Sequence, residues 1–269
     1  MLATRLPAVV GHFYPQSPRE LKRMVDGFLD DAKANAETGA QAELPVPKAM
    51  IAPHAGYIYS GPIAAAAYAP LIRAHAIITR VILLGPAHRV FVRGLATSSA
   101  TRFETPLGAI DLDRTAIERA LVLPQVRIMD EAHATEHSLE VQLPFLQEVL
   151  DGFRLVPFVV GDASAEEVAE VLDLLWGGDE TLIVVSSDLS HYLDYGTARA
   201  LDAATTEAIE GLNPEAIGYD QACGRHPING LLALARRRGL QAQTLDLRSS
   251  GDTAGPRDHV VGYGAYVFY

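Results

Sequence analysis

Three apolar segments of this chain are each followed by a histidine, and this repeated arrangement constrains the fold more than any other feature. The segments cover residues 49–52, 81–84 and 181–185, and the histidines are His54, His88 and His191. A short apolar run bounded by turn residues is typical of a buried strand in a sheet covered on both faces. Open α/β sheets place their ligand sites at the carboxyl ends of such strands. If the three strands are parallel neighbours, all three histidines lie at one edge of one sheet.

Segments with helical periodicity alternate with these strands. The pattern predicts helices over 18–36, 62–73, 139–150 (with Pro144 as a kink or in the first turn) and 228–238, a hairpin within 90–112, and strands at 241–248 and 260–269. Residues 37–47 are polar and rich in proline, which indicates a connector. The alternation favours an α/β fold with a central, mostly parallel or mixed sheet and helices on both faces. With 49% hydrophobic residues and no internal repeat, we expect residues 1–269 to form a single domain.

The composition argues against several classes of partner. A formal net charge of -11 repels a phosphate backbone, so nucleic acid is not an expected partner. No apolar run approaches the roughly 20 residues that a membrane-spanning helix needs, and the first ten residues do not resemble a signal peptide. The lone cysteine, Cys223, suits a reducing compartment, so we expect a cytoplasmic protein. None of these features argues against assembly into a homo-oligomer.

His54, His88 and Cys223 form a candidate metal site. Imidazole and thiolate are good ligands for Fe(II), Cu and Zn, and two histidines with one anion leave coordination positions open for water or substrate. The chain contains no HExxH or CxxC spacing, so the prediction depends on the placement of the histidines at strand ends. The structural alternative is that each histidine caps its strand by a hydrogen bond to a loop.

Asp188 and His191 are candidate catalytic residues just beyond the third strand. The carboxylate of Asp188 would orient the imidazole of His191 as a general base or beside a metal ligand. Asp188 also suits an N-cap for the turn that begins at Leu189.

Further side chains are candidates for the substrate pocket: Tyr57, His137, Glu140, Arg225 and His226. His137 and Glu140 are three residues apart and are expected to share a helix face. Arg225 and His226 lie beside Cys223 before a helix, an electropositive setting that is expected to lower the pKa of the thiol. Tyr57 either lines the pocket or packs in the core, whereas His259 resembles a surface residue.

Five segments together resemble a known family. PHAGYIYSG (53–61), LLGPAHRV (83–90), EHSLEVQLPFL (136–146), SSDLSHY (186–192) and CGRHPING (223–230) closely resemble the signature segments of the Memo family, whose prokaryotic members are named AmmeMemoRadiSam system protein B. The resemblance implies a fold similar to the catalytic subunit of class III extradiol ring-cleaving dioxygenases. It also implies a metal pocket formed by His54, His88 and Cys223, with Asp188 and His191 nearby.

The family is linked to iron or copper binding, to redox chemistry and, in its eukaryotic members, to peptides that contain phosphotyrosine. Its cysteine replaces the carboxylate of the dioxygenases, and a thiolate is softer and donates more charge to iron. The first hypothesis is therefore a redox enzyme that uses Fe(II), or alternatively Cu or Zn, on a small-molecule or peptide ligand. The second is a non-catalytic binding module for a peptide or another partner on the same scaffold. The third is a hydrolase or transferase with Cys223 as nucleophile.

Overall fold

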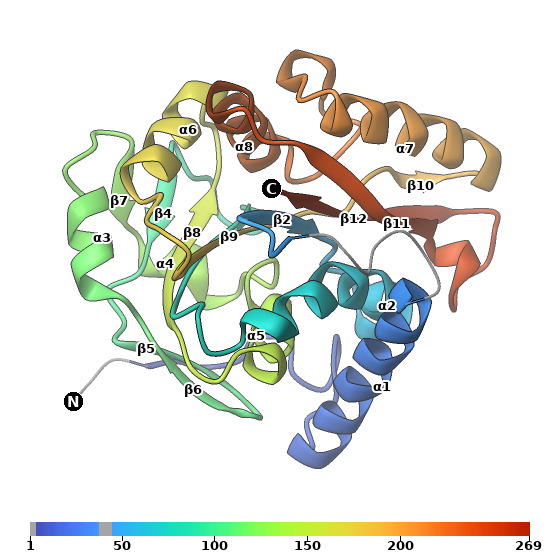
Figure 1. Ribbon diagram of the computed structural model, residues 1–269, viewed down its shortest axis with the longest axis horizontal. Coiled ribbons are helices and arrows are strands. Elements are labelled where there is room, and N and C mark those ends of the chain that lie inside the picture. Colours follow the sequence, from blue (N-terminus) through green and yellow to red (C-terminus); the bar gives the residue numbers. More distant parts are fainter. Residues whose placement is uncertain (1–3, 38–44) are drawn as a thin grey trace.

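In the computed structural model, which describes residues 4–37 and 45–269, nine strands form a mixed sheet at the centre of the protein (Figure 1). Its strands are β2 (Ala49–Ala52), β3 (Arg80–Pro86), β4 (Leu95–Thr97), β7 (Val126–Ile128), β8 (Arg154–Val160), β9 (Thr181–Ser186), β10 (His191–Leu193), β11 (Ala242–Ser249) and β12 (Val260–Phe268). The strand order is β10-β12-β2-β9-β3-β8-β4-β7, and β11 pairs with β12. A smaller sheet has the order β1-β5-β6, with β1 (Thr4–Arg5), β5 (Arg102–Thr105) and β6 (Gly108–Asp111).

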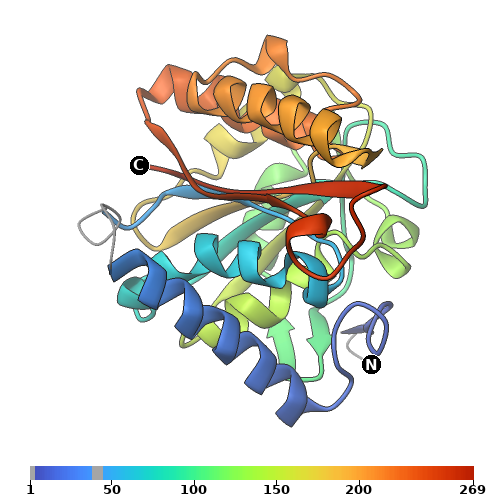
Figure 2. The same cartoon turned by 90° about the vertical axis from the view of Figure 1, so that its right-hand side faces the viewer.

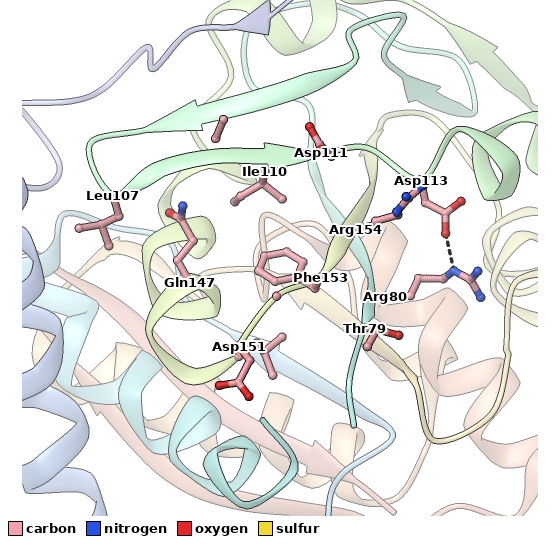
Figure 3. A pocket seen from close by; sticks show the side chains of 13 residues that line it. Thr79, Arg80, Leu107, Ile110, Asp111, Asp113, Gln147, Asp151, Phe153 and Arg154 are labelled. Carbon is pink, nitrogen blue, oxygen red and sulfur yellow. Dashed lines mark hydrogen bonds and ion pairs between the residues drawn. The ribbon is translucent and has the colours of Figure 1, made fainter. Parts of the chain in front are cut away.

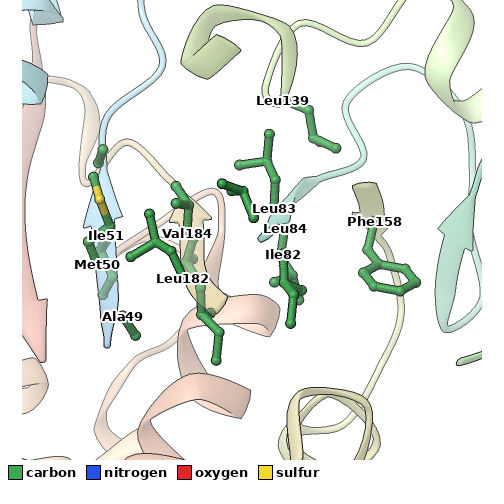
Figure 4. Packing of buried hydrophobic residues seen from close by; sticks show 14 of the residues in the cluster. Ala49, Met50, Ile51, Ile82, Leu83, Leu84, Leu139, Phe158, Leu182 and Val184 are labelled. Atoms are coloured by element: carbon green, nitrogen blue, oxygen red, sulfur yellow. The ribbon is translucent and has the colours of Figure 1, made fainter. Parts of the chain in front are cut away.

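The three histidine-terminated strands are parallel neighbours, as predicted. β9 lies between β2 and β3 and pairs with both in parallel, with Ala52 opposite Ser186 and Leu84 opposite Val185. Their apolar side chains are buried and pack against one another (Figure 4). Because the strands run in the same direction, their carboxyl ends meet at one edge of the sheet, where the polar segments begin.

Helices cover both faces of this sheet (Figure 2). The helices are α1 (Pro18–Glu37), α2 (Tyr57–Tyr68), α3 (Arg114–Ala120), α4 (Asp130–Ala134), α5 (Leu143–Val149), α6 (Ala165–Leu174), α7 (Tyr195–Glu210) and α8 (Arg225–Arg238). On one face α2 contacts β2 and β12 and is backed by α1 and α5, and on the other face α7 contacts β11 and β12 while α8 contacts β3 and β9. This arrangement confirms the predicted fold class and is consistent with the dioxygenase-like fold that the resemblance implies.

Several predicted boundaries were wrong. The helix expected to start at Pro62 begins at Tyr57 and ends at Tyr68, followed by a 3-10 helix over residues 69–74. Pro62 removes the partner of the Ile58 carbonyl, but Ile58 is exposed and water can replace that partner. The helix expected from 139 begins at Leu143 after a 3-10 turn, with Pro144 in its first turn.

Other predictions are only partly met. The helix expected from 228 already begins at Arg225. The hairpin expected within 90–112 is formed by β5 and β6, whereas β4 pairs with β7 and β8 in the large sheet. Most of the connector predicted over 37–47 lies outside the described residues.

Candidate metal centre

His54, His88 and Cys223 converge from three distant parts of the chain. His54 follows β2, His88 follows β3, and Cys223 lies in the turn before α8. One ligand atom from each lies within 4.8 Å of the others, and the Cys223 Sγ is 3.4 Å from the His54 Nε2. Two ligand atoms on one metal ion at about 2.0 to 2.3 Å are about 3.5 Å apart, so only small side-chain movements would allow all three to bind one ion.

The hydrogen bonds of Ser186 determine which nitrogen of His54 carries the proton. The Ser186 Oγ donates to the Ser138 carbonyl (2.6 Å) and accepts from the Gln142 Nε2 (2.7 Å). Because its single proton is already used, its 3.0 Å contact with the His54 Nδ1 requires that nitrogen to be the donor. The Nε2 of a neutral His54 therefore presents its lone pair toward Cys223. Burial, followed by the neighbouring His88, lowers the pKa of His54 well below its usual value, which favours this neutral form.

Glu136 plays the corresponding part for His88. Its buried carboxylate accepts from the His88 backbone N–H (2.7 Å) and contacts the His88 Nδ1 (2.9 Å). It also accepts from the backbone N–H groups of His137 and Ser138. Burial alone would raise the pKa of Glu136, but the neighbouring His137 and His88 outweigh it and hold the pKa far below its usual range. An ionised carboxylate only accepts, so the His88 Nδ1 carries a proton and its Nε2 is left for a metal.

Two glycines permit the close approach of these segments. A Cβ at Gly85, near the end of β3, would lie 2.8 Å from the Ser138 Oγ, so any side chain there would displace the loop that carries Glu136. A Cβ at Gly224 would lie 2.6 Å from the Ser187 Cβ, and the Gly224 N–H donates to the Ser187 Oγ (2.9 Å). Both positions therefore require the smallest residue for the site to assemble.

The predicted lowering of the Cys223 pKa is wrong. Although the residue is partly exposed as a whole, its thiol is largely enclosed, and burial followed by the negative charge of Asp188 raises the pKa to about 12. The thiol faces His54 at 3.4 Å. The sequence showed the charges next to Cys223 along the chain but not the direction of its side chain.

Asp188 is directed at a different histidine from the one expected. Its Oδ1 accepts the backbone N–H of His54 at 2.7 Å, and burial raises its pKa. Within residues 4–37 and 45–269 no hydrogen bond joins Asp188 to His191, which begins β10. Asp188 therefore fixes the backbone that carries His54.

Two cavities meet at this group of residues. The histidine-lined cavity has a volume of about 580 Å³ and is lined by His54, His88, His137, His191 and His259, with Asp188, Arg89, Phe13, Tyr59, Tyr263 and others. The cysteine-side cavity has a volume of about 680 Å³ and is lined by Cys223, Arg225, His226 and Tyr219, among others. His88, His191 and Tyr192 line both. His259 is exposed, as expected of a surface residue, and it also borders the histidine-lined cavity.

The remaining pocket candidates fall on both sides of the site. Arg225 lies over the ring of Tyr219 at 4.9 Å, and the His226 Nδ1 is 2.7 Å from the Ala163 carbonyl oxygen. The ring of His137 stacks on that of His88 with centroids 4.7 Å apart. Arg225 and His226 therefore line the cysteine-side cavity, whereas His137 lies on the other side.

Tyr57 and Glu140 point elsewhere. The Tyr57 hydroxyl donates to the Val141 carbonyl (2.6 Å) in the core, and Tyr59 lines the cavity instead. Glu140 forms a buried ion pair with Arg5 and accepts the Tyr14 hydroxyl (2.6 Å), so it anchors the N-terminal segment. The expected shared helix face is wrong because His137 precedes the 3-10 turn in which Glu140 lies.

A separate cavity lies at the other end of the strands (Figure 3). It is lined by Arg80 and Arg154, the first residues of β3 and β8. The Arg80 Nε donates to the Asp113 Oδ2 at 2.7 Å, while the Asp113 Oδ1 accepts from the Ala116 N–H and caps α3. These charges stabilise the fold, and the lining contains neither histidine nor cysteine.

Comparison with known proteins gives the same family along the whole chain. The family model for Memo-like protein matches residues 5–267. The chain belongs to the Memo family. A MEMO1 family protein of Aquifex aeolicus is 35% identical over 284 residues, covering 99% of this chain and 100% of the relative. A MEMO1 family protein of Saccharolobus islandicus is 35% identical over 286 residues, covering 98% of this chain and 99% of the relative.

The structure of this Memo protein also resembles the crystal structure of an uncharacterized protein from Escherichia coli K12. The TM-score is 0.51 with 15% sequence identity, and the match covers 83% of this chain and 100% of the other. At that identity the likeness concerns the fold alone. Among the helices of the described residues, none combines the length and the apolar character needed to cross a membrane.

Proposed function

We propose that this Memo protein binds one transition-metal ion through His54, His88 and Cys223 and uses it for redox chemistry. Fe(II) is the expected ion, with Cu or Zn as alternatives. The observation that carries the proposal is that one ring nitrogen from each of two imidazoles and the Cys223 sulfur lie within 4.8 Å of one another. The Nδ1 atoms of both imidazoles contact buried protein groups, Ser186 for His54 and Glu136 for His88. Soft sulfur and imidazole donors suit Fe(II), Cu and Zn better than Mg or Ca.

The chain's own residues divide the remaining work. When bound, the metal supplies a redox couple and Lewis acidity. Ser186 and Glu136 hold the two imidazoles in the tautomer that binds metal. His191 lines both cavities and is placed to accept a proton from a ligand in either, or to return it. Asp188 holds the backbone of His54 in place.

Elemental analysis of protein purified without oxygen tests the proposal. We expect about one iron atom per wild-type chain, little in Cys223→Ser and His54→Ala, and the wild-type content in His75→Asn. His75 is the control because it is an exposed histidine that pairs with Asp151. Equal metal content in wild type and in the two site variants would refute the proposal.

A partner-binding module is the second candidate, and exposed aromatic side chains favour it. Phe91, Tyr192 and Tyr219 are 79%, 74% and 78% exposed, and all three border the cysteine-side cavity. Exposed aromatic side chains that gather at a cavity are typical of binding surfaces. Fluorescence anisotropy with a peptide panel tests this function: binding should survive Cys223→Ser and be lost in Phe91→Ser. Loss of peptide binding in Cys223→Ser would contradict this second function.

The cysteine-nucleophile hypothesis has the least support. A nucleophilic thiolate needs a lowered pKa, whereas burial and Asp188 raise that of Cys223 to about 12. The imidazole that the thiol contacts is also that of His54, whose Nε2 lies 3.4 Å from the sulfur. Among the described residues no hydrogen bond joins the thiol to His191. Alkylation of Cys223 tests this role. If the alkylated protein keeps both its metal content and its turnover, Cys223 is neither a nucleophile nor a metal ligand.

A further inference from the structure

Within the described residues, two side chains other than glycine sit on a backbone with positive φ, Tyr192 (57°) and Leu212 (50°). This left-handed conformation is unfavourable for most residues that carry a Cβ. Leu212 lies just beyond the end of α7 and packs against the core, which offsets the strain. Tyr192 is 74% exposed, so burial of its side chain does not offset the strain there.

Tyr192 is the extra residue of a β-bulge. His191 lies opposite Val261 and Leu193 lies opposite Val260, so two steps along β10 match one step along β12. Where a bulge contains a left-handed residue, that residue is commonly glycine, because glycine has no Cβ. Bulges are frequent next to binding sites, where they redirect a side chain.

The bulge brings two consecutive side chains to the same cavities. In a regular strand, successive side chains point to opposite faces of the sheet. His191 and Tyr192 nevertheless both line the histidine-lined cavity and the cysteine-side cavity, and their ring centroids are 5.9 Å apart. Both side chains can lie on this side because the chain turns at residue 192.

The backbone just before the bulge is fixed by α7 and β12. The Ser190 N–H donates to the Asp202 Oδ1 (3.0 Å), and the Ser190 carbonyl accepts from the Gly262 N–H (2.8 Å). Asp202 is 3% exposed, and a Cβ at Gly262 would lie 2.0 Å from its Oδ2, so this packing leaves no room for a side chain. A strained conformation persists where the surrounding contacts determine it. Residue 192 must therefore make the turn that follows.

We propose that Tyr192 is a positioning residue, whose left-handed backbone directs the His191 imidazole toward both cavities. The inference rests on the proposed function, which assigns proton transfer to His191, and it specifies how the fold aims that side chain. His191 depends on the conformation of residue 192 and not on the phenol ring. Residues that adopt the left-handed conformation readily should replace Tyr192, whereas a β-branched residue should not.

Crystal structures of Tyr192→Gly, Tyr192→Asn and Tyr192→Val test the inference without any metal. All three variants lack the ring, so the glycine and asparagine variants are matched controls for the valine variant. We expect both controls to keep the bulge and the orientation of His191, and Tyr192→Val to change the register of β10 against β12 and turn the imidazole away. Tyr192→Thr, which is also β-branched, replaces the valine variant if that one does not fold. An unmoved His191 in the β-branched variant, or equal stability of the glycine and valine variants in urea, would overturn the inference.

The azide affinity of Co(II)-loaded protein, measured by absorption, shows the consequence for a ligand of the metal. We expect His191→Ala and Tyr192→Val each to weaken azide binding about three- to tenfold, and the glycine and asparagine variants to bind like wild type. The double variant of His191→Ala and Tyr192→Val should bind no more weakly than His191→Ala alone, because both changes remove the same contact.

Additive losses in the double variant, or a loss in Tyr192→Val that His191→Ala does not share, would overturn the inference. Failure of the wild type to bind Co(II) would instead refute the proposed metal site, and the crystal structures would still decide whether residue 192 positions His191.

Discussion

Glu136→Gln should weaken metal binding although Glu136 is not a proposed ligand. The carboxylate contacts the His88 Nδ1 at 2.9 Å and accepts the His88 N–H at 2.7 Å. Glutamine keeps the size of the side chain but replaces one acceptor oxygen with an NH2 donor. If the NH2 group faces the His88 ring, the imidazole loses the acceptor that fixes its tautomer; if it faces the His88 backbone N–H, the loop that positions the imidazole loses its anchor.

The size of the effect follows from that contact. A hydrogen bond to a charged group contributes about 1.5 to 3 kcal/mol. Only the share of this free energy that orients the His88 ring affects metal binding. Removing the group that orients a metal-binding histidine typically reduces metal affinity by about 10- to 100-fold. We therefore expect the dissociation constant for Zn or Co(II) to rise by at least about tenfold.

Competition with a chromophoric chelator measures this constant, and Glu140→Gln is the matched control. Glu140 is also a buried carboxylate, but its partners are Arg5, Tyr14 and the N-terminal backbone. The control should bind metal as tightly as wild type wherever it is folded. An affinity of Glu136→Gln within about twofold of wild type would refute the argument that Glu136 sets the His88 tautomer.

Three further predictions concern stability and assembly. Glu140→Gln should destabilise the fold by about 3 kcal/mol in urea unfolding, since it leaves the buried Arg5 charge unpaired, and a loss below about 1 kcal/mol would contradict this. Burial lowers the pKa of His133 to about 4, so stability that is fully present above pH 6.5 is lost as the pH falls toward 4. The loss amounts to about 3 kcal/mol, and His133→Gln should remove that part of the pH dependence; an unchanged slope would refute it. Gly224→Ala should lower metal content because its Cβ would meet Ser187, whereas Gly152→Ala, with open space around it, should not. Equal metal content in the two glycine variants would show that the close approach is not needed.

The placement of the site was predictable because it depends on local patterns. Apolar runs that stop at polar residues indicate buried strands, and the topology of parallel strands then brings His54 and His88 to one edge. Five separated motifs independently indicated the family that the comparisons confirm. Fold and family were therefore accessible from residues that are adjacent in sequence.

The roles of individual polar side chains were not predictable, because each depends on contacts between distant segments. Ser186 and His54 are 132 residues apart, and Glu136 and His88 are 48 apart. Glu140 was expected in the pocket because its spacing from His137 matches a helix, yet the chain is irregular there. The thiol pKa of Cys223 was misjudged because burial cannot be read from neighbours in the sequence.

X-ray absorption of zinc-loaded protein tests the central claim most directly, because it reports the atoms bound to the ion. For wild type we predict one sulfur at about 2.3 Å and imidazole nitrogens at about 2.0 to 2.1 Å, and for Cys223→Ser a shell without sulfur. A wild-type spectrum of nitrogen and oxygen ligands alone would contradict the claim that two histidines and a cysteine hold one ion.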